Sequence, residues 1–122
     1  MTVPSLANAE LAVMDLLWNE GGLTARELMM RLYPNAKRSQ HGTVQKLLQR
    51  LEEKGFVHRD RKAPVHVISA QLTRDEYACG QLETLADRVT GGSLAPMITH
   101  LVEERKLSRG EIDRLRRILE EA

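Results

Sequence analysis

The stretch SQHGTVQKLLQRLEEKG runs from Ser39 to Gly55 and carries the clearest helical pattern of the chain. It is predicted to form an amphipathic helix, with Ser39 as its cap and Gly55 as its stop. The apolar stripe has the i, i+3, i+4, i+7 spacing and consists of Val44, Leu47, Leu48 and Leu51. The opposite face carries small, amide and charged side chains: Gly42, Gln45, Lys46, Gln49, Arg50 and Glu53. Such a face can enter a nucleic-acid groove, although an ordinary surface helix with a solvated polar side explains these residues equally well.

Two short strands around a basic turn are predicted directly after this helix. Segments 56–61 (FVHRDR) and 65–69 (VHVIS) are rich in β-branched residues, and 62–64 (KAP) lies between them. A helix that leads straight into such a hairpin is the layout of a winged helix-turn-helix, in which the helix reads the major groove and the wing contacts phosphate or the minor groove. Residues 37–66 contain eight Lys/Arg and three Asp/Glu, a local charge of +5 in a chain of net charge +1. The positive charge is therefore concentrated in the predicted helix and wing.

Two helices are expected before this unit. The dense apolar pattern of residues 8–19 predicts a helix that is buried along much of its surface, with Asn8 as a candidate cap and Gly21-Gly22 as its end. Thr24 and Glu27 have the spacing of a capping box, in which each side chain bonds the backbone of the other residue. A second helix is therefore predicted from there to Tyr33-Pro34, and three helices and a hairpin complete the first 72 residues.

The remaining residues, 73–122, are predicted to form three more helices. Capping boxes at Thr73–Glu76 and Ser108–Glu111 begin the first and the last, and Ser93 is expected to cap the middle one, with Pro96 in its first turn. This region has eight basic and ten acidic residues, so the sequence assigns nucleic-acid binding to 1–72 and not to 73–122.

Apolar stripes on these three helices predict a homodimer. Fifty residues of amphipathic helix bury little surface alone, so packing against a second copy is the economical solution; a tail folded back on the winged domain of a monomer is the alternative. The predicted dimerisation residues are Leu82, Leu85, Val89, Leu94, Met97, Ile98, Leu101, Val102, Ile112, Leu115 and Leu119. The expected fold is thus mainly α with a small β-hairpin, a winged helix-turn-helix domain followed by a three-helix dimerisation region.

Composition excludes several function classes. Proteins that bind single-stranded nucleic acid stack the bases on aromatic side chains, and this chain of 122 residues has only four. The composition therefore favours double-stranded DNA. No stretch approaches the roughly 20 apolar residues of a membrane span, and no signal peptide is evident, so a cytoplasmic protein without a membrane partner is expected. The single cysteine, Cys79, suits a reducing compartment and is expected to be a small packed residue.

Enzymatic and metal chemistry are disfavoured. The sequence has no phosphate-binding glycine loop, nucleophile elbow or paired carboxylates, so no catalytic residues and no cofactor are predicted. The four histidines and Cys79 are scattered without metal-ligand spacing, and no metal is expected. His58 and His66 are the only pair that a hairpin could bring close together.

In these motifs the chain resembles the penicillinase repressor (BlaI/MecI/CopY) family of winged-helix regulators. Order and spacing agree over roughly residues 6 to 121. In the first part the resembling stretches are 10–18 (ELAVMDLLW), 23–28 (LTAREL) and 43–57 (TVQKLLQRLEEKGFV); in the second they are 74–77 (RDEY), 91–94 (GGSL) and 107–116 (LSRGEIDRLR).

The resemblance implies a homodimeric transcriptional repressor on a pseudo-palindromic DNA operator. Its third helix would enter the major groove and its wing would contact the backbone. The expected DNA-binding residues are Arg38, Ser39, Gln40, His41, Gly42, Thr43, Gln45, Lys46, Arg50, Arg59, Arg61 and Lys62. Gln can pair with adenine and Lys can donate to guanine, while the Thr43 hydroxyl could equally bond its own helix backbone.

The chain departs from the family at three places. Ser39-Gln40 stands where the family often has Trp-Ser, so an aromatic prop for the helix entry is missing. Some members are cut by a sensor protease at an Asn-Phe bond in the penultimate helix, a further partner to consider; His100-Leu101 stands there, so the resemblance does not carry the cut over. The chain ends LEEA without the Cys-x-Cys pairs of copper-responsive members.

Two other readings stay open. One is a metal- or ligand-sensing winged-helix regulator, which would leave DNA in response to its effector. The other is a protein-interaction module that uses the polar helix face for a partner protein. Salt dependence of binding and metal dependence separate these readings from a DNA-binding repressor.

Overall fold

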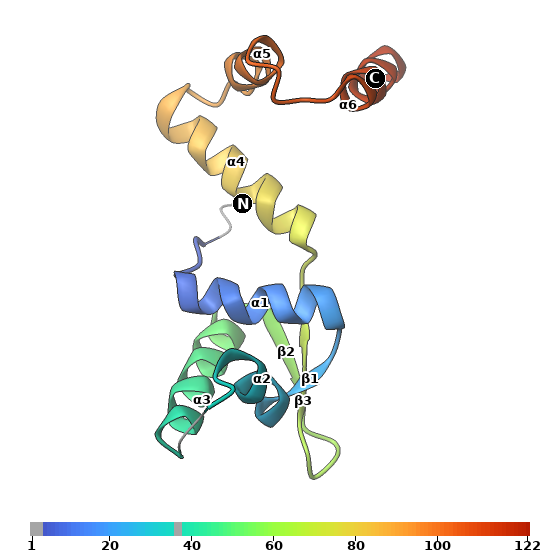
Figure 1. Cartoon of the computed structure of the whole chain (residues 1–122). Coiled ribbons are helices and arrows are strands. Elements are labelled where there is room, and N and C mark those ends of the chain that lie inside the picture. Colours follow the sequence, from blue (N-terminus) through green and yellow to red (C-terminus); the bar gives the residue numbers. More distant parts are fainter. Residues whose placement is uncertain (1–3, 36–37) are drawn as a thin grey trace. The chain divides into compact units, whose positions relative to one another are not determined.

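The computed structural model of this chain describes residues 4–35 and 38–122, the first two of the second range by their backbone only. The predicted class, mainly α with a small β-hairpin, is confirmed (Figure 1). In chain order the elements are α1 (Asn8–Glu20), β1 (Leu23–Thr24), α2 (Ala25–Leu32), α3 (Arg38–Glu53), β2 (Val57–Asp60), β3 (Val67–Ala70), α4 (Arg74–Val89), α5 (Ala95–Glu103) and α6 (Arg109–Glu121).

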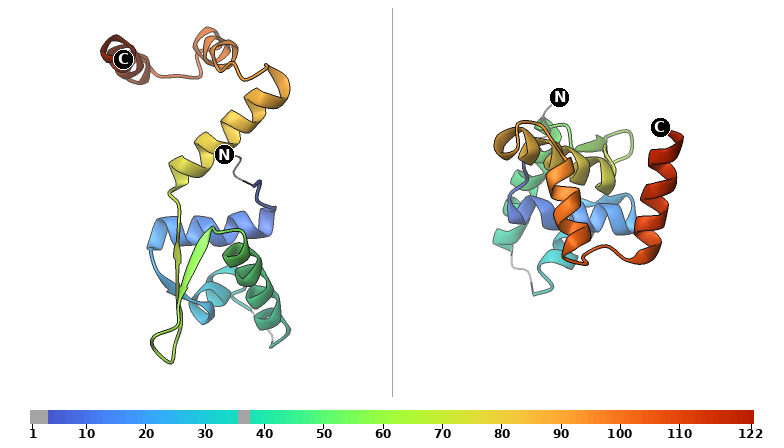
Figure 2. Two further views of the ribbon diagram at one scale, coloured as in Figure 1. Left: turned by 180° about the vertical axis from the view of Figure 1, so that it is seen from behind. Right: turned by 90° about the horizontal axis from the view of Figure 1, so that it is seen from above.

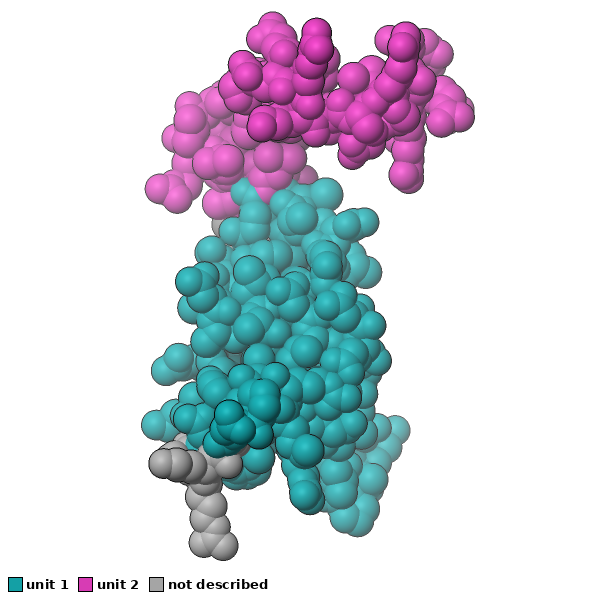
Figure 3. Space-filling model, viewed as in Figure 1, with its two compact units in different colours: residues 1–81 teal, residues 82–122 magenta. Residues whose placement is uncertain are grey.

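The chain divides into two compact units, Met1–Gln81 and Leu82–Ala122 (Figure 3). The division falls inside α4, because the start of this helix packs against α1. The Tyr77 ring lies 6.0 Å from that of Trp18 between centroids, and its hydroxyl accepts the Leu6 N–H at 2.9 Å. The assignment of DNA binding to residues 1–72 and of dimerisation to 73–122 stays a prediction.

The first unit contains a three-stranded antiparallel sheet of order β1-β3-β2. The hairpin was predicted, and its strands pair Val57 with Ala70 and Arg59 with Ile68. β1 was not predicted; it pairs Leu23 with Ile68 on the other side of β3. β1 therefore ties the turn before α2 to the wing (Figure 1).

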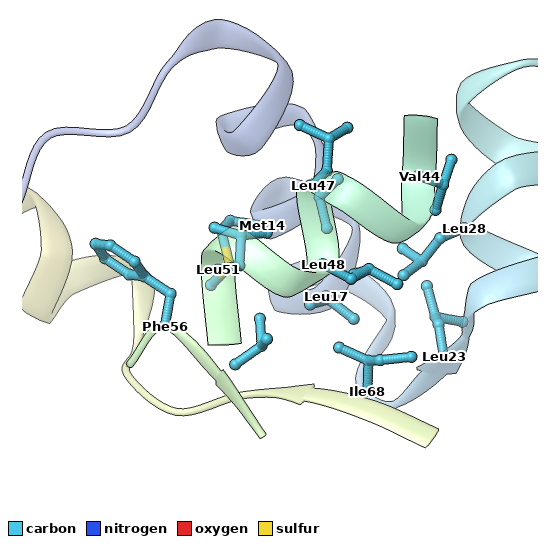
Figure 4. Packing of buried hydrophobic residues seen from close by; sticks show 12 residues of the cluster. Met14, Leu17, Leu23, Leu28, Val44, Leu47, Leu48, Leu51, Phe56 and Ile68 are labelled. Atoms are coloured by element: carbon cyan, nitrogen blue, oxygen red, sulfur yellow. The ribbon is translucent and has the colours of Figure 1, made fainter. Parts of the chain in front are cut away.

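A mostly aliphatic core, with Phe56 as its aromatic member, joins the three helices to this sheet (Figure 4). The predicted stripe of α3 is buried throughout, since Val44, Leu47, Leu48 and Leu51 are at most 6% exposed. Each fully buried side chain of this kind contributes about 1.5–3 kcal/mol. Their partners in the core are Val13, Met14, Leu17, Leu23, Leu28, Phe56, Val57 and Ile68.

Several predicted helix boundaries are confirmed by their hydrogen bonds. Thr24 Oγ1 accepts the Glu27 N–H, and the Glu27 carboxylate accepts the Thr24 N–H. The same reciprocal pair forms at Thr73–Glu76 and at Ser108–Glu111. Gly55 has φ +82°, and the Phe56 N–H returns to the Leu51 carbonyl, so α3 ends in a Schellman motif, as its glycine indicated.

Three predicted caps were wrong. Asn8 lies inside α1, whose N-cap is Ala7, because the Glu10 carboxylate accepts the Ala7 N–H. α3 already begins at Arg38, so Ser39 is not its cap. Ser93 does not cap α5, which starts from Leu94 without a side-chain bond. A cap bonds the N–H two or three positions on, and for Ser93 one of these is Pro96, which has no N–H.

Candidate nucleic-acid interface

The polar face of α3 is exposed over most of its length. His41, Gly42, Thr43, Lys46 and Arg50 are exposed, and Gln40 and Gln45 are half-buried. Arg38 and Ser39 lie in the first turn, but their side chains are outside the described residues. Because its apolar side is buried in the core, α3 presents one continuous polar side to solvent.

The hairpin turn and the N-terminal end of α3 lie at the same end of the first unit (Figure 1). In Figure 1 and in the left view of Figure 2, the turn between β2 and β3 protrudes at this end, and α2 lies near it. Lys62 in the turn is exposed, and its N–H is bonded by the Asp60 carboxylate at 3.0 Å. The first turns of α3 and the turn of the wing therefore lie at one end, whereas Arg50 lies in the last turn of α3.

The two wing arginines bond to α3. Arg59 Nη2 donates to Gln45 Oε1 at 3.2 Å. Arg61 forms a bidentate pair with the Glu52 carboxylate at 2.7 and 2.8 Å. The hydrogen bond from Arg61, together with its charge, lowers the pKa of Glu52, and the same bond raises the pKa of Arg61. The wing is thus fixed to the helix by two side-chain contacts that were not predicted from the sequence.

A shallow cleft of about 280 Å³ separates α2, α3 and the wing. Gln45 and Arg59 line it together with residues that are not among the predicted DNA-binding residues. Arg26 is one of these residues. Its position in the first turn of α2 is the sequence feature that could have identified it as part of this cleft. The lining consists of Thr24, Ala25, Arg26, Gln45, Arg59, Pro64, Val65, His66 and Ile68.

Lys54 directly follows the end of α3, and its partly exposed side chain reaches a buried carboxylate of the first unit. Its Nζ donates to both oxygens of the Glu10 carboxylate, at 2.9 and 3.0 Å, and the Glu10 side chain is only 3% exposed. Burial alone would raise the pKa of Glu10, but the Ala7 N–H, the Lys54 bond and charge, and the charge of Arg50 together lower it. Lys54 therefore joins α1 to α3.

The predicted dimerisation residues lie on surfaces that a single chain leaves open. Val89 is 70% exposed and Leu119 is 73% exposed. Leu94, Met97 and Ile112 are half-buried, and the rest of the set, Leu82, Leu85, Ile98, Leu101, Val102 and Leu115, are 37–48% exposed. A groove of about 440 Å³ between α5 and α6 is lined by Ile98, Val102, Ile112, Leu115, Arg116, Ile118, Leu119 and Glu120.

Among residues 4–35 and 38–122, no three His, Cys, Asp or Glu side chains are grouped so that they could hold a metal ion. Cys79 was expected to be packed but is exposed on α4, so that prediction was wrong; only part of this helix packs against α1. In the same described ranges, no helix is long and apolar enough to cross a membrane.

Comparison with known proteins agrees with this geometry. The sequence model of the penicillinase repressor family matches residues 6–121. The chain belongs to the penicillinase repressor family. Its relatives bear the names of a repressor and of a transcriptional regulator. The prediction that the protein is not an enzyme is therefore confirmed.

Two relatives and one solved structure illustrate the membership. The chain is 29% identical over 119 residues to a penicillinase repressor of Bacillus licheniformis, covering 98% of this chain and 92% of the relative. It is 34% identical over 119 residues to the transcriptional regulator BlaI of Mycobacterium tuberculosis, covering 95% and 83%. The solution structure of the DNA-binding domain of the repressor BlaI matches with a TM-score of 0.52 at 27% identity, covering 63% of this chain and 94% of that domain.

Proposed function

We propose that this protein is a DNA-binding transcriptional repressor that acts as a homodimer on a pseudo-palindromic operator. The observation that carries the proposal is the exposed polar side of α3, whose N-terminal end lies at the same end of the first unit as the hairpin turn (Figure 1). A helix with a buried stripe on one side and amide, hydroxyl and basic groups on the other is suited to the major groove. The family's repressors give this reading its biological context.

The contacts divide by chemistry. Gly42, Thr43, Gln45 and Lys46 would face the bases from the first turns of α3. Arg50 and Lys62, both exposed, would meet phosphates, with Arg59 and Arg61 partly engaged by the helix. Base contacts then supply specificity, and phosphate contacts supply orientation and the salt-dependent part of the affinity.

A second copy of the chain is the proposed partner for the second unit. The large apolar residues that α4, α5 and α6 leave on the surface of one chain are between 37% and 73% exposed, whereas the smaller Ala86 is buried. Exposed apolar surface of this extent is unusual in a monomer and is removed from water at a symmetric interface. Two-fold symmetry would also give the operator its two half-sites.

Fluorescence anisotropy across a salt series tests the proposal. The purified protein is titrated onto a labelled duplex from its own upstream region and onto a scrambled duplex of equal length. Preference for the first by roughly a thousandfold, at two subunits per site, is the expected result for a specific repressor. Equal binding to both duplexes that falls steeply with salt would mean that the polar side of α3 binds DNA only through charge. No binding to either duplex would favour a protein-interaction module.

A repressor acts where the chromosome lies, so we place the protein in the cytoplasm.

A sensor protease, if it acts on this chain as on some relatives, would meet the bond His100–Leu101, whose residues are exposed within α5. A helix must open before it can be cut, so mass analysis of the protein from induced cells is the direct test.

A further inference from the structure

The hydrogen bond between the wing and α3 fixes which end of the Gln45 amide can face a base. A guanidinium has donors only, so the atom that Arg59 Nη2 meets at 3.2 Å must be the amide oxygen. This settles the orientation of an amide whose oxygen and nitrogen are otherwise hard to distinguish. The oxygen of Gln45 is therefore directed to the wing.

The amide nitrogen of Gln45 stays available. In the part of the chain that the structure describes, no protein acceptor bonds Nε2, and this nitrogen is not one of the buried side-chain atoms without a partner. An unpartnered Nε2 that is not among those buried atoms keeps contact with solvent, and Gln45 lines the cleft between α2, α3 and the wing. It offers two N–H donors there.

We propose that Arg59 is a positioning residue for base recognition: it holds Gln45 as a donor, so that this position of the operator is read as guanine rather than adenine. This role rests on the proposed function, since it requires α3 in the major groove. Guanine presents two acceptors, N7 and O6, side by side, which suit the two N–H groups of Nε2. Adenine presents an acceptor and the N6 amine, and pairing with it needs the glutamine oxygen as well.

Arg59 disfavours adenine in a second way. The second lone pair of the Gln45 oxygen is still open, but a cation lies beside it. The adenine amine is a donor with positive hydrogens, so it would approach a site already occupied by a positive group. The same cation attracts the acceptor edge of guanine. Charge and hydrogen-bond geometry therefore favour the same base.

Selection from a random pool of duplexes, carried out with the full-length protein, tests this role. The position that Gln45 reads is the one at which the wild-type preference disappears in Gln45→Ala. At that position the wild type is expected to prefer guanine over adenine by about tenfold. Arg59→Met frees the glutamine oxygen and is expected to move the preference to adenine at that position alone.

Two further variants separate positioning from charge and from folding. Arg61→Met removes the same charge from the same wing but leaves the Gln45 bond intact, because Arg61 pairs with Glu52, and it is expected to keep guanine. Gln45→Glu keeps an acceptor for Arg59 but offers the groove no donor, so cytosine, which presents an amine, is expected. Melting curves confirm that each variant is folded.

The outcomes are distinct. Adenine at this position in the wild type, an unchanged preference in Arg59→Met, or no position that responds to Gln45→Ala would overturn the role of Arg59 while leaving a DNA-binding repressor. Enrichment of no sequence by the wild type would overturn the proposed function itself, and the role of Arg59 with it.

Discussion

Replacing Lys54 with methionine should reveal the buried ion pair that joins α1 to α3. The Glu10 side chain is 3% exposed and accepts two bonds from Lys54 and one from the Ala7 N–H. Removing one partner of a buried pair costs about 3–5 kcal/mol, because the other charge is left unpaired. Lys54 is itself 35% exposed and the Ala7 bond remains, so water replaces part of the loss. We expect the free energy of unfolding to fall by about 2–3 kcal/mol at pH 7.5.

The pH dependence of this loss identifies its cause. In the wild type the folded-state pKa of Glu10 lies below its ordinary value of 4.5, so the pair stabilises the fold above that pH and the contribution is lost as the pH falls. Without Lys54, burial is opposed only by the Ala7 bond and the charge of Arg50, so the pKa of Glu10 rises. The carboxyl then protonates more readily, and the difference between variant and wild type should shrink toward pH 4.5.

Urea unfolding followed by the fluorescence of Trp18, the only tryptophan, measures this effect in the first unit. Protein concentration is held constant, because dimerisation also stabilises the chain. Arg31→Met is the matched control: its pair with Glu20 is about one-third exposed on both sides and should be worth less than about 1 kcal/mol. The double variant Glu10→Gln, Lys54→Met should recover most of the loss. Equal losses for Lys54→Met at both pH values, or a loss no larger than that of Arg31→Met, would refute a buried-charge explanation.

Three other predictions concern the DNA interface and the dimer. Gln45→Ala and Lys46→Ala should each cost roughly 1–3 kcal/mol on the operator but much less on random DNA, as measured by anisotropy; equal losses on both would contradict base reading. Leu115→Asp should separate the dimer in light scattering, because the charge would be buried unpaired. Arg117→Gln, which lowers the charge by the same amount on the same helix, should not, and an unchanged mass for both variants would argue against the tail as interface. Gly42→Ala should stabilise the first unit by about 0.5–1 kcal/mol in urea, since a Cβ there meets nothing within 4 Å. The same change should weaken operator binding in anisotropy, because the added methyl group stands on the side of α3 that faces the groove, and unchanged binding would contradict a close approach at Gly42.

Local features of this fold were predictable from the sequence. The capping boxes at Thr24, Thr73 and Ser108 each need only residues three positions apart, so their sequence pattern already contains both partners. Ser93 also precedes a helix, but Pro96 lacks the N–H that a cap would bond. The apolar stripe of α3 was also predictable from local sequence, because the spacing of its apolar residues alone indicates which side of the helix is buried.

Contacts across the fold were not predictable in this way. β1 has only two residues, Leu23 and Thr24, and it is a strand because β3 lies beside it. Glu10 and Lys54 are 44 positions apart, and nothing in either local pattern indicates the other. The bond from Arg59 to Gln45 likewise depends on how the wing packs on the helix.

These long-range contacts change how the positive charge of the region must be counted. The excess of +5 over residues 37–66 treats every cation as available to DNA. Lys54, however, is neutralised by Glu10, a residue outside that window, and Arg61 is held by Glu52 inside it. Among the described side chains the cations left for phosphates are chiefly Lys46, Arg50 and Lys62, with Arg59 shared between Gln45 and the DNA. Each phosphate contact adds about 0.9 to the slope of log K against log salt, so the slope per subunit should be smaller than eight basic residues suggest.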